Sequence, residues 1–365
     1  MLVLGLLILL MTVSRRIAIL LAFLALIFPA PGWSDPAEDA LNEALTLHDS
    51  GKVKEALLKY DLAIRLNRRF GDAYYNRGNA YYDLGQNERA IKDYSEVIRL
   101  SPKDSDAYYN RGNAYRRLGQ RDRALQDYSR AIDLAPENAE IYMNRGSIYY
   151  SLGQYAPALQ DYTQAIRLSP SDADSFYNRA NTHMKMGKIE LATEDYSTAL
   201  RLNPDLLDAR YNRAIAYADL KEYKKALADY DEFLYAKPKS PEAYFNRGLV
   251  YAALGNDENA MADYSEAVRL NPKDIAALYN RGLVYNRLGE YERAARDYTE
   301  VIVLSPRNAN AYAQRAVTRI YQGKDQEAEG DVKKAYQLDA TLKKTLPALI
   351  DEAKSKRTVN PVSAP

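Results

Sequence analysis

The stretch DAYYNRGNAYYDLGQNERAIKDYSEVIRLSPKD, residues 72–104, returns in recognisable form every 34 residues along the chain. Its landmarks are an Asn-Arg-Gly triplet at 76–78, a Leu-Gly pair at 84–85, an alanine at 90, an Asp-Tyr pair at 93–94 and a proline at 102. The same landmarks stand 34 positions later in the next stretch. A fixed period of this length predicts an array of stacked structural repeats instead of two or three ordinary globular domains.

Nine consecutive units of 34 residues follow one another without an insertion: 37–70, 71–104, 105–138, 139–172, 173–206, 207–240, 241–274, 275–308 and 309–342. Within each unit the apolar residues recur at helical spacing in two segments. A glycine that suits the left-handed end of a helix separates the segments in eight units, and Lys221 takes its place in the sixth. A proline ends the second segment in seven units, because it cannot continue a helix. Each unit is therefore expected to be a helical hairpin, and the fold class to be all-α.

The composition argues against several classes of function. The chain has 50 Lys and Arg residues against 49 Asp and Glu residues, and the charges are interspersed, so the sequence offers no basic field for nucleic acid. It has no cysteine, which excludes disulfides and thiol chemistry. The two histidines, His48 and His183, stand in different units and are not expected to share a metal ion. We expect no cofactor and no metal.

The pattern resembles the tetratricopeptide repeat from Ala37 to Leu342. Numbering each unit from 1, the small residue that this family carries at position 8 is Ala44, Gly78, Gly112, Gly146, Ala180, Ala214, Gly248, Gly282 and Ala316. The family's alanine at position 20 is present in all nine units, from Ala56 to Ala328. Small residues there allow the two helices to approach closely. The resemblance implies a right-handed superhelical solenoid of nine helix-turn-helix repeats, with a concave groove lined by the first helix of each repeat.

Two shorter segments follow the repeats. Residues 343–356 carry an apolar stripe that includes Leu346, Leu349 and Ala353, and they are expected to form a capping helix with a polar outer side. Residues 357–365 have no periodicity and are predicted to be disordered.

Residues 1–34 are interpreted as a secretory signal peptide. Read from Met11, the sequence MTVSRR is a basic region, residues 17–28 are an apolar run, and residues 29–34 contain the breakers and small residues of a cleavage site. Cleavage is predicted after Ser34, and Met11 is an alternative start to Met1. An uncleaved anchor is the alternative, although a membrane span needs about 20 apolar residues and this run is shorter. We expect a bacterial protein that is periplasmic or secreted, or else anchored to the membrane and facing the periplasm.

Positions 7 and 23 carry opposite charges in every unit. Position 7 is arginine and position 23 is aspartate in eight units, as in the pairs Arg77 and Asp93, Arg111 and Asp127, and Arg145 and Asp161. In the first unit Glu43 and Lys59 reverse both signs together. Since the two helices meet at positions 8 and 20, positions 7 and 23 lie close to the contact. We infer a structural ion pair that links the two helices of each hairpin, and the alternative is that the charges are separately solvated.

A row of asparagines at position 6 is the first candidate binding surface. The resemblance implies that positions 2, 5, 6, 9, 12 and 13 face the groove. Position 6 is Asn42, Asn76, Asn110, Asn144, Asn178, Asn212, Asn246 and Asn280, followed by Gln314. A side-chain amide offers a donor and an acceptor, so such a row can hold the backbone of an extended peptide. The row is similar to the asparagine ladder of the O-linked N-acetylglucosamine transferases. The alternative is that these asparagines serve helix packing.

An aromatic row at position 5 runs beside the asparagines. Its members are Tyr75, Tyr109, Tyr177, Tyr211, Phe245 and Tyr279, with Met143 among them. Tyrosine offers a large contact area with little side-chain entropy to lose, so the row suits recognition of a partner. Packing between successive repeats is an equally good interpretation of the same row.

The groove is predicted to turn from polar to apolar along the array. Position 9 passes from Asn79 and Asn113 in early units to Leu249 and Leu283 in late ones. Hydrophobic anchors of a ligand are therefore expected to bind between Tyr211 and Leu283.

Together these features favour a non-enzymatic scaffold that binds extended peptide or protein partners in its groove. Envelope assembly or secretion is the broader role that we expect for such an exported protein. Two alternatives stay open. One is a regulatory or carrier subunit that presents a substrate to a separate enzyme, and the other is an envelope glycan-binding protein that would use the tyrosine row.

Overall fold

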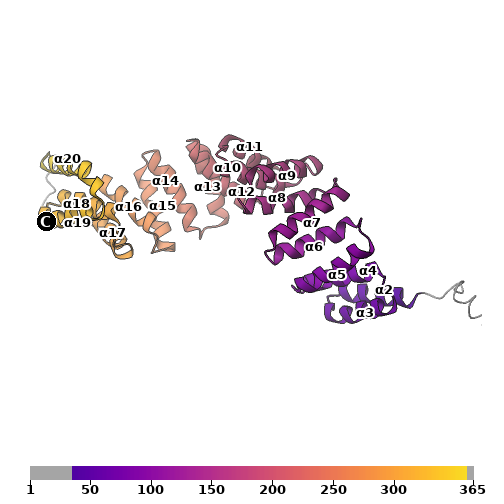
Figure 1. Ribbon diagram of the computed structural model, residues 1–365. Coiled ribbons are helices and arrows are strands. Elements are labelled where there is room, and N and C mark those ends of the chain that lie inside the picture. Colours follow the sequence, from indigo (N-terminus) through magenta and orange to yellow (C-terminus); the bar gives the residue numbers. More distant parts are fainter. Residues whose placement is uncertain (1–34, 360–365) are drawn as a thin grey trace, which may run out of the picture. The chain divides into compact units, whose positions relative to one another are not determined.

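A computed structural model describes residues 35–359, and its regular elements are 19 α-helices, labelled α2 to α20, and one short 3-10 helix (Figure 1). Within residues 35–359 there is no strand, so the fold class is all-α. The predicted signal peptide and residues 360–365 of the predicted tail lie outside the described residues. None of the helices in the described part has the length and apolar character that a membrane span requires.

The chain divides into two compact units between Ile148 and Tyr149, inside helix α8. In the first unit, consecutive helices pair as hairpins, and each hairpin packs on the next (Figure 1). Its helices are α2 (Pro36–Asp49), α3 (Val53–Leu66), α4 (Gly71–Asp83), α5 (Asn87–Leu100), α6 (Ser105–Arg117), α7 (Arg121–Leu134) and most of α8 (Ala139–Ser151).

The second unit repeats the same arrangement. Hairpins α10–α11, α12–α13, α14–α15, α16–α17 and α18–α19 follow one another, and the second helix of each packs on the first helix of the next. Its helices are α9 (Tyr155–Leu168), α10 (Ala173–Lys185), α11 (Ile189–Leu202), α12 (Leu207–Asp219), α13 (Tyr223–Ala236), α14 (Pro241–Ala253), α15 (Asp257–Leu270), α16 (Ile275–Arg287), α17 (Tyr291–Leu304), α18 (Ala309–Tyr321), α19 (Asp325–Leu338), the 3-10 helix η1 (Ala340–Lys344) and α20 (Leu346–Val359).

In the hairpins that lie within one unit, from the first to the eighth repeat, a buried tyrosine at position 24 packs against a small residue at position 8. Tyr94 is 1% exposed, and a Cβ atom on Gly78 would lie only 2.8 Å from its Cε1. Gly112 stands in the same relation to Tyr128, also at 2.8 Å. Real Cβ atoms do not approach a ring so closely, so glycine at position 8 lets the ring lie directly on the backbone of the first helix.

The turn inside each hairpin ends the first helix in the left-handed conformation. The amide of Gly85 donates to the carbonyl of Tyr82 at 3.0 Å, and the next amide donates to Tyr81 at 2.8 Å. These two bonds satisfy carbonyls that the end of the helix leaves unpaired. Lys221 adopts the same conformation with a φ of 59°, and it is the only non-glycine residue with positive φ among those described.

The array ends in α20, which packs on α18. Leu346 and Ala353 are buried there, whereas Leu349 of the predicted stripe is 41% exposed. The cap was predicted to end at residue 356 and disorder to begin at 357, but the helix continues to Val359. The reason is Arg357, which donates to the carbonyl of Ile320 at 2.8 Å and to Asp325 at 2.5 Å.

Candidate functional site

A bidentate ion pair joins the two helices of a hairpin. Nε and Nη2 of Arg77 on α4 donate to the two carboxylate oxygens of Asp93 on α5, at 2.8 and 2.6 Å. Burial lowers the pKa of Arg77, but the hydrogen bond and charge of Asp93 raise it by more, so the guanidinium stays charged. The same two-bond geometry links Arg111 to Asp127, Arg179 to Asp195, Arg213 to Asp229, Arg247 to Asp263, Arg281 to Asp297 and Arg315 to Asp331.

The first hairpin keeps the link with its charges reversed. Nζ of Lys59 lies 2.8 Å from a carboxylate oxygen of Glu43, and both side chains are more exposed than the arginine pairs. The structure therefore brings together the two residues whose signs change together in the sequence. The remaining predicted pair is Arg145 on α8 and Asp161 on α9. Asp161 is buried, and Arg145 donates to Oγ of Ser129 at 3.0 Å.

The contact of Arg145 with Ser129 belongs to a second set of links that the sequence analysis missed. The arginine at position 7 also reaches back to position 25 of the preceding hairpin. Nη1 of Arg77 donates to Asp61 at 2.6 Å, and Nη1 of Arg111 donates to Ser95 at 3.0 Å. The signal was present in the sequence, because position 25 is polar and short in eight units: Asp61, Ser95, Ser129, Thr163, Ser197, Asp231, Ser265 and Thr299. Within each unit, the arginine of a hairpin thus holds that hairpin together and links it to the previous one.

The asparagine row and the aromatic row are joined to each other between successive repeats. Nδ2 of Asn110 donates to the hydroxyl of Tyr75 at 2.8 Å, and Nδ2 of Asn144 donates to that of Tyr109 at 2.7 Å. In the second unit Asn246 donates to Tyr211 at 2.8 Å, and Asn212 to Tyr177 at 3.4 Å. Packing between repeats is therefore a role of both rows.

Two asparagines show that this bond depends on a hydroxyl in the preceding repeat. Asn280 follows a repeat with Phe245 at position 5, and its amide donates to the carbonyl of Ala276 in its own helix at 2.9 Å. Asn76 follows Leu41 and donates to Asp72 of its own helix at 2.8 Å. Asn178 and Tyr279 are half-buried on α10 and α16. The side-chain amides of Asn76 and Asn280 thus bond within their own helices, and both side chains are half-buried.

In some repeats the asparagine at position 9 completes a polar network. The hydroxyl of Tyr94 donates to Oδ1 of Asn79 at 2.8 Å, and Nδ2 of Asn110 lies 3.4 Å from the same oxygen. In the fifth repeat, Oδ1 of Asn181 accepts from the hydroxyl of Tyr196 at 2.6 Å. It also accepts from Nδ2 of Asn212, at position 6 of the next repeat, at 3.0 Å. One amide oxygen therefore satisfies both the buried tyrosine and the asparagine of the following repeat.

This network stops in the sixth and seventh repeats, where position 9 is Ile215 and then Leu249. Leu249 is 40% exposed, as several other leucines of the array are, and it lies on the lining of a pocket. The hydroxyl of Tyr264 is buried and has no hydrogen-bond partner among the described residues. Leu283 in the eighth repeat is half-buried. Position 9 is thus aliphatic in this stretch, and the binding of a ligand's hydrophobic anchors there stays a prediction.

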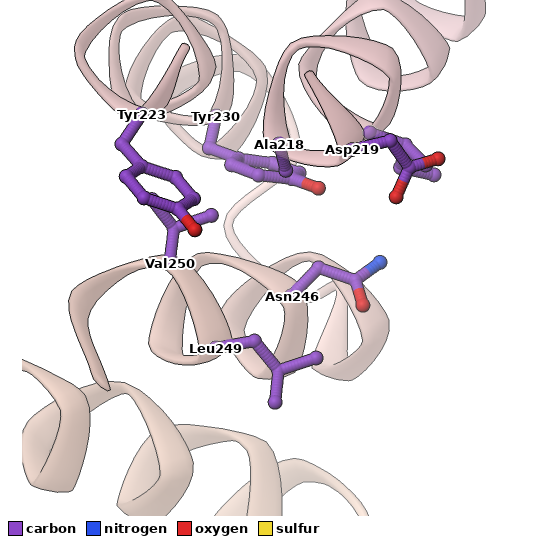
Figure 2. A pocket seen from close by; sticks show the side chains of 8 residues that line it. Ala218, Asp219, Tyr223, Tyr230, Asn246, Leu249 and Val250 are labelled. Atoms are coloured by element: carbon purple, nitrogen blue, oxygen red, sulfur yellow. The ribbon is translucent and has the colours of Figure 1, made fainter. Parts of the chain in front are cut away.

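A pocket of about 240 Å³ lies in this apolar stretch of the second unit, between α12, α13 and α14. Figure 2 shows Tyr223 and Tyr230 on one side of the pocket and Asn246, Leu249 and Val250 on the helix of the other side. The residues that line the pocket are Ile215, Ala218, Asp219, Tyr223, Tyr230, Asn246, Leu249 and Val250.

A second pocket of about 350 Å³ lies beside the first and shares Ile215 with it. Its lining mixes polar and apolar side chains as that of the first pocket does, with Tyr177, Asn181 and Lys185 among its residues. Positions 6, 9, 12 and 13 of successive first helices contribute to these two pockets, as the resemblance implied for the groove. We call the two pockets together the second-unit groove.

The described residues contain no group of three or more histidine, aspartate or glutamate side chains placed to hold a metal ion. His48 contacts the hydroxyl of Tyr60 at 3.3 Å and Asp83 at 3.1 Å. His183 is buried in another hairpin, with Nε2 3.7 Å from Asp195. Both histidines therefore serve the packing of the hairpins.

Sequence profiles of the tetratricopeptide repeat (TPR) match residues 44–85, 78–119, 112–153, 146–187, 177–241, 248–289 and 275–308. The chain belongs to the tetratricopeptide repeat family. TPR proteins generally mediate protein–protein interactions, and their scaffolds are generally non-enzymatic. The family therefore supports a partner that is a protein or peptide.

Solved structures share this TPR fold at low sequence identity. The C-terminal part of a TPR repeat-containing protein from Cytophaga hutchinsonii is 22% identical with a TM-score of 0.57, over 65% of this chain and 98% of that one. YrrB, described as a TPR protein with an unusual peptide-binding site, is 24% identical with a TM-score of 0.49, over 52% and 97%. PilF of Pseudomonas aeruginosa is 22% identical with a TM-score of 0.49, over 57% and 94%. A search of curated protein sequences finds no significant match.

Proposed function

We propose that this TPR protein is a non-enzymatic scaffold that binds an extended peptide segment of a partner protein in its second-unit groove. The observation that carries the proposal is the pocket between α12, α13 and α14, where the polar network ends and Leu249 stands exposed beside Asn246. An apolar pocket with a few fixed polar groups is the usual form of a binding site.

The groove side chains are held in place before a ligand arrives. The amide of Asn246 is fixed by its bond to Tyr211, and the ring of Tyr211 packs on Tyr230 and Phe233 with ring centres 6.0 and 4.9 Å apart. A site whose side chains are already ordered loses less entropy on binding. Covering the exposed isobutyl group of Leu249 supplies a favourable hydrophobic term. The groove therefore suits a peptide with an apolar anchor residue.

The proposal is tested with dodecapeptides selected from a random phage-displayed library on the purified protein. We expect the selected peptides to carry an apolar residue. Leu249→Asp should weaken their binding about tenfold or more in fluorescence anisotropy, because burying the aspartate carboxylate against the peptide's apolar residue is costly. Asn113→Asp, at the same repeat position in the first unit, is the matched control. A larger effect of Asn113→Asp, or a failure to select any peptide, would contradict the proposal.

We further propose that the scaffold acts outside the cytoplasm, in the periplasm or cell envelope, and takes part in envelope assembly or secretion. The support is the basic and apolar pattern of residues 11–34 in the sequence. A fusion of residues 1–34 to an alkaline phosphatase that is active only after export should be active in bacteria. Sequencing the amino terminus of the mature protein should begin at Asp35, and an inactive, cytoplasmic fusion would refute the export.

A further inference from the structure

We propose that the pocket between α12, α13 and α14 binds a backbone carbonyl oxygen of the peptide, next to its apolar side chain, through the hydroxyl of Tyr230 and the amide of Asn246. This inference rests on the proposed peptide-binding function and adds the chemistry of the ligand group that the pocket recognises. It assigns a binding role to Tyr230, a residue that belongs to the buried tyrosines of the hairpins.

The repeats themselves show what these two donors bind. In the fifth repeat, the tyrosine at position 24 and the asparagine that begins the next repeat both donate to one oxygen, Oδ1 of Asn181, at 2.6 and 3.0 Å. In the second repeat the corresponding oxygen of Asn79 lies 2.8 and 3.4 Å from its two donors. The two donors therefore converge on a single amide oxygen in the second and fifth repeats, whereas in the third repeat Asn113 accepts from Tyr128 and the next asparagine, Asn144, donates to Tyr109.

In the sixth repeat the same donors are present and the acceptor is not, because position 9 is Ile215. Tyr230 is 1% exposed, and its hydroxyl makes no hydrogen bond within residues 35–359, yet the residue lines the pocket (Figure 2). Asn246 gives one amide hydrogen to Tyr211 and has a second hydrogen available. An amide oxygen brought in by a ligand would satisfy both groups, as the side chain of Asn181 does in the repeat before.

The lining selects among possible ligand oxygens. The carboxylate of Asp219 lies on the same pocket and repels a carboxylate, whether of a side chain or of a chain end. A purely aliphatic ligand would leave the buried hydroxyl unpaired, which costs binding energy. A neutral amide carbonyl avoids both penalties, and Leu249 with Val250 contacts the apolar side chain beside it. The pocket is thus built for an apolar residue inside a peptide chain, not for its carboxyl terminus.

The neighbouring repeats do not offer the same pair of donors. In the seventh repeat the hydroxyl of Tyr264 is buried out of reach, and Asn280 donates to its own helix. In the eighth, Nδ2 of Asn286 lies 3.4 Å from the hydroxyl of Tyr298. Of the position-24 tyrosines in these three apolar repeats, Tyr230 is the one that lines a pocket of the second-unit groove, so the pocket between α12, α13 and α14 takes one carbonyl.

The test compares two equally buried tyrosines at position 24, of which Tyr94 donates a hydrogen bond to another described residue and Tyr230 does not. Tyr230→Phe should weaken the binding of a library-selected dodecapeptide about 3- to 10-fold, the effect of one hydrogen bond, and leave the Tm unchanged because no intramolecular bond is lost. The matched control Tyr94→Phe removes a hydroxyl that donates to Asn79, so it should lower the Tm and leave the peptide affinity unchanged. Affinity is measured by fluorescence anisotropy and Tm by circular dichroism.

Two further experiments test whether the group bound by Tyr230 and Asn246 is a peptide carbonyl. Ile215→Asn places an acceptor inside the chain, so it should weaken peptide binding without lowering the Tm. A peptide in which a trans-alkene replaces the amide after the anchor residue should bind the wild type more weakly, and Tyr230→Phe should add nothing to that loss.

The possible results distinguish a failure of the carbonyl site from a failure of peptide binding in the groove. If Leu249→Asp abolishes binding while Tyr230→Phe binds as tightly as the wild type, the peptide groove stands and the carbonyl site is wrong. Equal losses of Tm in Tyr230→Phe and Tyr94→Phe would also overturn the carbonyl site, because the Tyr230 hydroxyl would then have a structural partner. If no peptide binds the wild type, both the function and the inference fall.

Discussion

At the scale of single residues, Leu249 and Tyr264 show that the apolar groove has a cost in the folded state. Leu249 stands where Asn79 accepts a hydrogen bond from the buried tyrosine of its repeat, and the hydroxyl of Tyr264 is left without an acceptor. An unsatisfied buried hydroxyl costs about 1–3 kcal/mol. The seventh repeat therefore lacks a stabilising hydrogen bond that the second repeat makes.

Leu249→Asn should recover part of that cost. The new amide oxygen can accept from Tyr264 as Asn79 accepts from its tyrosine, and we expect the free energy of unfolding to rise by about 1 kcal/mol in urea titrations. Leu254→Asn is the control, since that leucine is 49% exposed and has no buried hydroxyl to satisfy. If the two variants have the same stability, the unpaired hydroxyl is not costly.

His183 makes the stability of the second unit depend on pH. Burial lowers the pKa of His183, the charges of Arg179 and Lys188 lower it further, and Asp195 raises it. The unfolded chain takes up a proton near pH 6.5, whereas the folded chain does so only at lower pH, so the unfolded state binds more protons in between. The free energy of unfolding should therefore fall as the pH drops below about 6.5.

The measurement is the Tm of the wild type and of His183→Phe between pH 8 and pH 5.5. We expect the wild type to lose stability over this range and the variant, which cannot be protonated at this position, to lose less. Parallel curves would show that the buried imidazole does not control this part of the pH dependence.

At the scale of elements, the arginine links decide whether two helices stay paired. Arg111→Ala leaves the buried carboxylate of Asp127 without its two donors and also removes the bond to Ser95. We expect a loss of about 1–3 kcal/mol in the free energy of unfolding. Arg130→Ala is the control, because its pair with Asp133 is exposed and 3.7 Å long, and such pairs contribute little. Similar effects on both would contradict the structural role of the pair.

The turn of the sixth hairpin contains the strained residue Lys221, whose φ is 59°. Lys221→Gly should raise the free energy of unfolding by about 1 kcal/mol, because a side chain in the left-handed region carries a steric cost that glycine avoids. Gly85→Ala, at the same position of the second hairpin, should shift stability in the opposite direction. The pair of variants can be compared by thermal unfolding, and a loss of stability in Lys221→Gly would contradict the argument.

The hairpins and their ion pairs were predictable because they depend on neighbours within one repeat. The period predicted the two helices, and the joint reversal of Glu43 and Lys59 indicated which charges meet. The bonds from Asn110 to Tyr75 and from Arg111 to Ser95 were not predicted. They join successive hairpins, and the angle at which one hairpin stacks on another cannot be read from spacing within a repeat.

No pocket was predicted from the sequence, only an apolar stretch of the groove between Tyr211 and Leu283. The change to Ile215 and Leu249 indicated an apolar stretch, but the hydroxyl of Tyr230 looked like a core group in the sequence. Its access to the pocket depends on the side chains of two hairpins and appears only in three dimensions.

At the scale of the whole molecule, each repeat is stabilised mainly by its neighbours, as in other solenoids. The second unit ends in η1 and α20, which cover the last hairpin, with Leu346 and Ala353 buried against it. Ending the chain after Leu338 should therefore lower the Tm of the protein and promote aggregation, seen by light scattering. Substituting the exposed Leu349 with Ser should do neither, and an unchanged Tm in the truncated chain would show that the cap is dispensable.

The arginine links also bear on how such a chain can change its length. Each arginine finds one partner 16 residues ahead and another 16 residues behind, as Arg77 does with Asp93 and Asp61. Inserting or deleting a whole 34-residue unit at a repeat boundary inside the array leaves an acceptor at both distances, so no charge is stranded. Gene duplication or loss can thus lengthen or shorten the binding surface one step at a time, while the interior chemistry of every remaining joint is preserved.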